Sequence, residues 1–237
     1  MPLCNRVTPF GDIVSHPARY PPATAMFGNR GVLHDDNRRI VKPHAGRMWL
    51  SCRLHVSRTR KTQRDDNRAF NGRKRVLMTP RRYTELFFLD EPTALAAGHR
   101  PCACCRRQDY TLFLRAWTRA FPRREPWTAA AVDSALHAER LAPGGGKARH
   151  AARLADLPDG VLVTALSSSR EDGGAWLLWR GALHEWSHLG YGEARGVAGL
   201  LEERGAAHEV EVLTPRSLVA TLQAGFAPGR PHASAEG

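Results

Sequence analysis

The sequence has no long hydrophobic run. No stretch approaches the roughly 18 apolar residues that a membrane-spanning helix needs. The first residues, MPLCNRVTPFGDIV, also lack the basic segment and apolar stretch that mark a secretory signal. We therefore expect a cytoplasmic protein that makes no contact with a membrane. Its 237 residues can bury a hydrophobic core without crosslinks, as one large domain or two small ones.

Acidic residues are scarce in the first half of the chain. Residues 1–125 hold 25 Lys and Arg against 10 Asp and Glu, whereas residues 126–237 hold 10 against 13. The net charge of +12 therefore comes from the first half. A general bias toward arginine would act on both halves equally. The asymmetry instead predicts contact with a polyanion, and phosphate backbones are the commonest polyanions in the cytosol.

The densest basic segment lies between residues 58 and 82, which hold ten Lys and Arg and two Asp. Residues 57–75 offer almost nothing to bury, so we expect a solvated loop or a hairpin tip there. Arginine forms bidentate hydrogen bonds with phosphate. The alternative is a solvated loop that has no partner. The residues selected for phosphate contact are Arg58, Arg60, Lys61, Arg73, Lys74, Arg75, Arg106 and Arg107.

Hydrophobic periodicity predicts a mixture of strands and helices. Residues 47–56 alternate with a period of two, which indicates a strand with Cys52 on its apolar side. Asp90 as a cap and Gly98 as a stop predict a short helix between them. A longer helix begins at or just after Cys105. Further elements are expected as strands at 75–78, 83–89, 160–166, 175–186 and 208–213 and as helices at 128–141 and 214–226.

Cysteine is also sparse: the chain holds Cys4, Cys52, Cys102, Cys104 and Cys105. A reducing cytosol disfavours disulfides, so metal or redox chemistry is the better interpretation. Cys102 and Cys105 have the Cys-x-x-Cys spacing that brings two thiolates onto one tetrahedral ion. The positive N-terminal end of the helix that follows favours their negative charge. Cys104 points elsewhere in this scheme.

A closed zinc site needs four ligands, so two more are required. Cys52 and Cys4 are the leading candidates, and His34, His55 or His99 could replace either of them. A cysteine on the inner face of a strand is also often only a small buried apolar residue. The predicted Zn²⁺ ligands are Cys4, Cys52, Cys102 and Cys105.

The segment TELFFLDEPTALAAGHRPCACCRR, within about residues 83–107, resembles the second half of the Ada-type metal-binding domain. In that family a four-cysteine zinc site lies on DNA, and one zinc-bound thiolate accepts a methyl group from a backbone methylphosphotriester. The resemblance implies that Cys102 and Cys105 are the last two zinc ligands. It also implies a role in DNA repair or modification, with DNA favoured over RNA. The family's upstream Cys-x-x-x-Cys pair has no counterpart, because Cys52 stands alone in the strand region.

Two other functions remain open. Zinc-dependent nucleobase deaminases combine His-x-Glu with Pro-Cys-x-x-Cys. Both halves occur here, as His137-Ala138-Glu139 and Pro101 to Cys105, but in reversed order. An amphipathic helix also explains His137 and Glu139 without catalysis. The third class is a structural zinc module that serves protein contacts.

The composition changes near residue 142, where PGGGKARHAA is typical of a flexible link. The prediction is an α+β fold, with a small zinc-stabilised sheet with helices followed by a mostly β C-terminal portion and one closing helix. The predicted divisions are a basic zinc-binding domain at 1–141, a linker at 142–156, a β-rich domain at 157–228 and a disordered tail at 229–237. The sequence does not indicate an oligomeric state.

Overall fold

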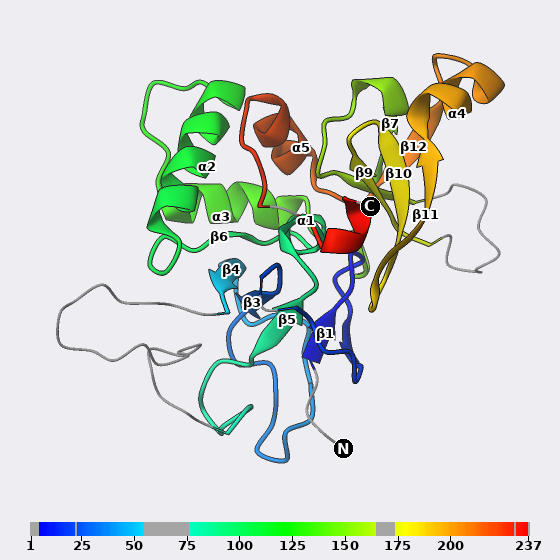
Figure 1. Ribbon diagram of the computed structural model, residues 1–237. Helices are drawn as coiled ribbons and strands as arrows, with labels where there is room; N and C mark the ends of the chain where they lie inside the picture. Colours follow the sequence, from blue (N-terminus) through cyan, green and yellow to red (C-terminus); the bar gives the residue numbers. More distant parts are fainter. Residues whose placement is uncertain (1–4, 22, 55–75, 165–173, 230, 237) are drawn as a thin grey trace, which may run out of the picture.

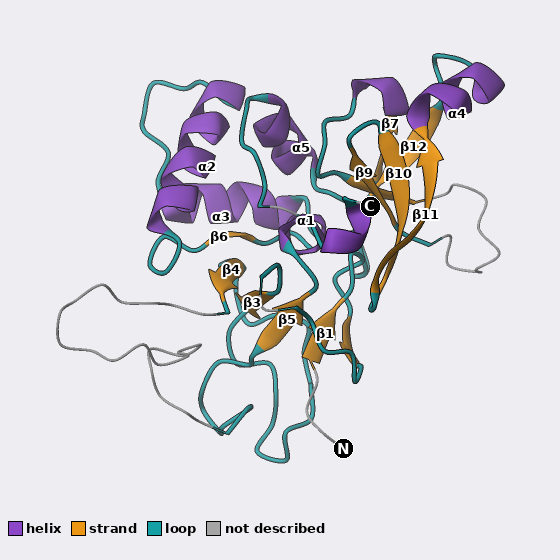
Figure 2. Cartoon of the chain, in the orientation of Figure 1, coloured by secondary structure: helices purple, strands orange, loops and turns teal. Residues whose placement is uncertain are grey.

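The computed structural model describes residues 5–21, 23–54, 76–164, 174–229 and 231–236. Within these ranges the chain forms five α-helices and two six-stranded sheets (Figures 1 and 2). The predicted α+β class, with a closing C-terminal helix, is confirmed. No helix in the described ranges is long and apolar enough to cross a membrane.

The first sheet contains short strands in the order β2-β1-β5-β3-β4-β6. Their bounds are Asn5–Val7 for β1, Ile13–Ser15 for β2, Met26–Asn29 for β3, Leu50–Arg53 for β4, Leu86–Phe88 for β5 and Arg100–Pro101 for β6. The strands predicted at 47–56 and 83–89 correspond to β4 and β5, whereas β1, β2 and β3 lie where no strand was assigned from the sequence. Strands of three or four residues among Pro and Gly are too short to show a period of two.

The second sheet has the order β11-β10-β9-β8-β12-β7. Its strands are β7 (His150–Arg153), β8 (Leu162–Thr164), β9 (Trp176–Trp179), β10 (Ala182–Ser187), β11 (Gly190–Gly196) and β12 (Glu209–Val212). β7 falls inside the segment predicted as a linker, yet it pairs with β12 along its whole length. Residues 150–153 are therefore an edge strand, and the linker prediction is wrong there.

The helices follow their local signals closely. They are α1 (Glu91–Ala96), α2 (Arg107–Ala120), α3 (Ala129–Ala138), α4 (Val197–Arg204) and α5 (Arg216–Gln223). Asp90 caps α1, because its carboxylate accepts a hydrogen bond from the Thr93 N–H at 3.0 Å. Gly98 ends the turn after α1 with φ +86°, a conformation that glycine adopts without strain. α4 was not predicted.

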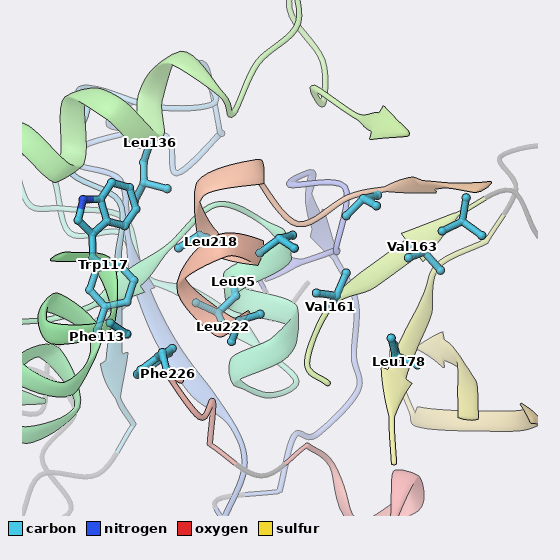
Figure 3. Packing of buried hydrophobic residues seen from close by; sticks show 14 of the residues in the cluster. Leu95, Phe113, Trp117, Leu136, Val161, Val163, Leu178, Leu218, Leu222 and Phe226 are labelled. Atoms are coloured by element: carbon cyan, nitrogen blue, oxygen red, sulfur yellow. The ribbon is translucent and has the colours of Figure 1, made fainter. Parts of the chain in front are cut away.

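The main hydrophobic core is shared by both halves of the chain (Figure 3). Side chains from α1, α2 and α3 pack with side chains from β8, β9 and α5. The labelled members are Leu95, Phe113, Trp117, Leu136, Val161, Val163, Leu178, Leu218, Leu222 and Phe226. A domain boundary between 141 and 157 would expose this core, so the two predicted domains are one packed unit in the structure.

The described part of the predicted tail is also packed. The His232 N–H donates to Asp90 Oδ2 at 2.9 Å, and the Tyr191 N–H donates to Ser234 Oγ at 2.7 Å. The Ala235 side chain is buried. Residues 231–236 therefore join the N-terminal end of α1 to the second sheet instead of forming a disordered tail.

Gly28 in β3 offers a test of how tightly the first sheet is packed. A Cβ atom there would lie 2.3 Å from Cε2 of the buried Phe88 ring. We expect Gly28→Ala to lower the free energy of unfolding by about 1–3 kcal/mol through overpacking. The matched control is Gly199→Ala in α4, where no atom lies within 4 Å and alanine should stabilise the helix by about 0.5–1 kcal/mol. Denaturant unfolding would measure both, and equal effects would contradict the prediction.

Candidate metal centre

The pairing of two strands brings Cys52 close to Cys102. β4 runs parallel to β6, with Ser51 opposite Pro101 (Figure 1). The Cys102 N–H then donates to the Ser51 carbonyl at 3.0 Å. Cys52 and Cys102 are fifty residues apart in the sequence. Each comes directly after one residue of the Ser51–Pro101 strand pair, so the two cysteines lie close together.

The turn between β6 and α2 adds the third cysteine. The Arg106 N–H donates to the Cys102 carbonyl at 3.0 Å, which closes the turn and places Cys105 beside Cys102. The sulfurs of Cys52, Cys102 and Cys105 all lie within 4.8 Å of one another. Sulfurs around a tetrahedral zinc ion are about 3.8 Å apart for Zn–S bonds of about 2.3 Å. The three residues thus fit a thiolate metal site, and we call them the cysteine group.

Hydrogen bonds within the cysteine group favour a thiolate at Cys102 and thiols at Cys52 and Cys105. Hydrogen bonds from the thiols of Cys105 and Cys52 lower the pKa of Cys102, and the Cys104 N–H also donates to its sulfur at 3.4 Å. The hydrogen bond to Cys102 raises the pKa of Cys52 and that of Cys105. A metal that binds all three as thiolates must therefore displace protons from Cys52 and Cys105.

Among the described residues, none of the other candidate ligands joins the group. Cys104 is exposed and outside it, as expected. Cys4 and His55 lie outside the described residues. No histidine completes the group in the part of the chain that the structure describes. His34 instead contacts Thr84 Oγ1 at 2.6 Å, and His99 contacts Arg30 Nε at 3.1 Å.

The two residues of the deaminase alternative are engaged elsewhere. The His137 ring packs against His44 and Trp49, with ring centroids 5.1 and 6.3 Å apart. The Glu139 carboxylate accepts hydrogen bonds from the N–H and the hydroxyl of Ser217, at 2.9 and 2.8 Å. Glu139 thereby holds the first turn of α5.

Two of the eight predicted phosphate contacts lie among the described residues. The other six, Arg58, Arg60, Lys61, Arg73, Lys74 and Arg75, lie outside them. Arg107 is exposed at the start of α2. Arg106 is buried, and its guanidinium forms ion pairs with Glu91 at 2.7 Å and with Asp109 at 2.9 Å. Its donors are used inside the protein, so Arg106 lacks the free surface that the prediction requires.

A pocket of about 360 Å³ is lined by residues from β3, β4 and α2. Arg53 and Arg106, the sequence neighbours of Cys52 and Cys105, both line it. Glu91 also lines it, and its Oε2 accepts a hydrogen bond from the Gly229 N–H at 2.7 Å. The contacts of Glu91 could not be predicted from the sequence, because Gly229 is distant from it in the chain.

No protein-family model, curated protein or solved structure matches this chain. The Ada-type resemblance thus remains a hypothesis that rests on the motif in residues 83–107. The arrangement of the cysteines is the stronger basis for a functional proposal.

Proposed function

We propose that the protein binds one zinc ion through Cys52, Cys102 and Cys105 and uses this centre in contact with nucleic acid. The observation that carries the proposal is the convergence of three sulfurs from two separate segments of the chain. A group of thiols that serves only to fill the core has no need to bring its sulfurs together. The clustering favours a ligand role for Cys52 over the alternative that it is only a small buried apolar residue.

The donor set favours zinc among the common metals. Thiolates are soft ligands that select zinc, copper(I) or iron–sulfur clusters over magnesium or calcium. Three protein ligands leave a fourth tetrahedral position, which Cys4 would fill in a closed structural site. Water or a substrate would fill it in a reactive site.

The nucleic-acid part of the proposal is supported by charge and by motif. The basic excess lies in the same half of the chain as the cysteine group. Arg107 adds an exposed cation at the start of α2, directly after the Cys-x-x-Cys turn. The Ada-type resemblance of residues 83–107 favours DNA as the partner and repair or modification as the role.

The chemistry that this resemblance suggests is methyl transfer to a cysteine. A thiolate would attack the methyl carbon of a backbone methylphosphotriester, so that an S–C bond forms and the C–O bond breaks. The phosphate oxygen leaves with the electron pair and becomes part of an ordinary phosphodiester. Cys52 and Cys105 are the partly exposed candidates for the acceptor, whereas Cys102 is buried.

The metal is tested by counting thiolates around a substituted ion. Cobalt(II) in place of zinc should show an intense sulfur-to-metal absorption whose strength scales with the number of bound thiolates. We expect one metal per chain, and a weaker band in Cys4→Ser if Cys4 is the fourth ligand. A purified protein that holds no metal and gives no such band would overturn the proposal.

Nucleic-acid contact and methyl transfer are tested separately. Affinity for a short DNA duplex should fall with salt, with a slope near −0.9 for each phosphate contact. Incubation with duplex that carries a methylphosphotriester should add one methyl group to one cysteine, as peptide mass mapping would show. Binding without methylation would leave a zinc-stabilised binding protein, and binding that does not respond to salt would contradict phosphate contact.

A further inference from the structure

Trp49 is a buried ring in contact with two arginine and two histidine side chains. The guanidinium carbons of Arg30 and Arg140 lie 4.0 and 4.7 Å from its ring centroid. The rings of His99 and His137 lie 5.4 and 6.3 Å from it, centroid to centroid. We call these five residues the Trp49 cluster. They come from distant parts of the sequence and meet at the end of α3.

The Trp49 cluster concentrates unpaired polar atoms. Eleven buried side-chain nitrogens and oxygens in the described part of the chain have no hydrogen-bond partner. Four of them belong to the four residues that pack against Trp49: Arg30 Nη2, Arg140 Nη2, His99 Nδ1 and His137 Nδ1. Buried polar atoms are ordinarily paired, so a concentration of this kind indicates a missing partner.

Two of these atoms, on Arg30 and Arg140, belong to guanidiniums whose positive charge is not locally neutralised. Among the described residues, Arg30 and Arg140 form no ion pair, and their other donors go to carbonyl oxygens and to His99. Elsewhere in the same half, buried arginines are paired, as Arg100 is with Asp133 at 2.7 Å. A buried charge without a partner costs far more than a paired one.

The nearest carboxylates have other roles. Asp12 interacts electrostatically with Arg30, and Asp133 and Glu139 interact electrostatically with Arg140. In the described part of the chain, none of the three forms an ion pair with these arginines. Asp12 is exposed, Asp133 is paired with Arg100, and Glu139 is bound to Ser217.

A third cation adds to the same field. The Lys147 ammonium donates to the Ala96 carbonyl, and burial followed by the charges of Arg30 and Arg140 lowers its pKa to about 7. Burial is the main cause that lowers the pKa of His44, and the positive charges of Arg30 and Arg140 lower it further. Burial is also the main cause that lowers the pKa of His137, and the charge of Arg140 adds to it. Both rings are partly exposed, so the positive field extends from the core to the surface.

We propose that the Trp49 cluster, with Lys147, binds a phosphate group. Two guanidinium donors and two ring nitrogens without partners match the several acceptor oxygens of phosphate, and three cations match its charge. The inference deepens the nucleic-acid part of the proposed function, and it needs neither the metal nor the cysteine group.

The first test is stabilisation of the full chain by inorganic phosphate. The thermal midpoint should rise with phosphate and saturate, relative to chloride at equal ionic strength. Arg140→Met should weaken phosphate binding about 10- to 100-fold, because charge-assisted hydrogen bonds are lost. Lys147→Met is the second variant and disturbs the fold less, since the ammonium donates a hydrogen bond to the Ala96 carbonyl; it should also weaken phosphate binding. Arg115→Met, on the exposed face of α2, is the matched control and should respond like the wild type.

The source of the phosphate follows from a parallel titration with a DNA duplex. A loss of both phosphate and duplex affinity in Arg140→Met would identify the cluster as a backbone contact. A loss of the phosphate response alone would identify a site for free phosphate or a nucleotide, with DNA bound elsewhere. No saturable response in the wild type, or a wild-type response in both Arg140→Met and Lys147→Met, would overturn the inference. The cobalt absorption is independent of these results, so failure of the metal proposal is distinguishable.

Discussion

Cys102→Ser is expected to lower zinc affinity by at least about a thousandfold and to leave the protein as unstable as its metal-free form. Cys102 is the acceptor within the cysteine group, since the thiols of both Cys105 and Cys52 donate hydrogen bonds to it. Structural zinc contributes about 10–16 kcal/mol of binding free energy in small zinc peptides, and that energy becomes folding energy. A serine hydroxyl does not ionise at neutral pH, so it cannot replace the thiolate.

The measurement is metal content after purification, together with thermal unfolding in the presence and absence of a chelator. Chelator should lower the midpoint of the wild type and leave that of Cys102→Ser unchanged. The control is Cys104→Ser, because Cys104 is exposed and lies outside the group. If Cys102→Ser retained one tightly bound zinc ion, the assigned ligand set would be wrong.

Acid should release the metal from the wild type. The pKa values of Cys52 and Cys105 are raised in the metal-free protein, so binding must displace their protons. Lower pH favours those protons, and zinc affinity must therefore fall as the pH falls. Cys104→Ser should follow the wild-type profile.

The sequence predicted those parts of the fold that depend on neighbours in the chain. Asp90 and Gly98 bound α1 as their chemistry requires, and α2 begins directly after the Cys-x-x-Cys turn. The alternation of residues 47–56 predicted the strand that carries Cys52. The parallel pairing of β4 with β6 could not be predicted, because β6 is two residues long and carries no periodic signal.

The parts that were missed depend on contacts across long sequence separations. The boundary near residue 142 followed a local change in composition, but the core joins α2 and α3 to β8 and α5 across that boundary. Arg30 and Arg140 carry no sequence signal at all, because arginine is expected at the surface. Their burial against Trp49 is visible only after folding.

Arg106→Met is expected to lower the free energy of unfolding by about 3–5 kcal/mol, whereas Arg107→Met should change it by less than about 0.5 kcal/mol. The Arg106 side chain is 6% exposed, and its guanidinium lies 2.7 Å from a Glu91 oxygen whose side chain is 3% exposed. Methionine would leave that carboxylate buried without its cation. Arg107 is the adjacent residue, but it lies exposed on the first turn of α2.

The ion pair can be separated from simple loss of packing. In Arg106→Met the unpaired carboxylate of Glu91 should favour its protonated form, so the deficit relative to the wild type should shrink as the pH falls. Adding Glu91→Gln to Arg106→Met removes the buried charge, and the double variant should lose less than the sum of the two single variants. Denaturant unfolding at two pH values measures all four proteins. Additive losses with no dependence on pH would show that Arg106 acts through its bulk and not through its charge.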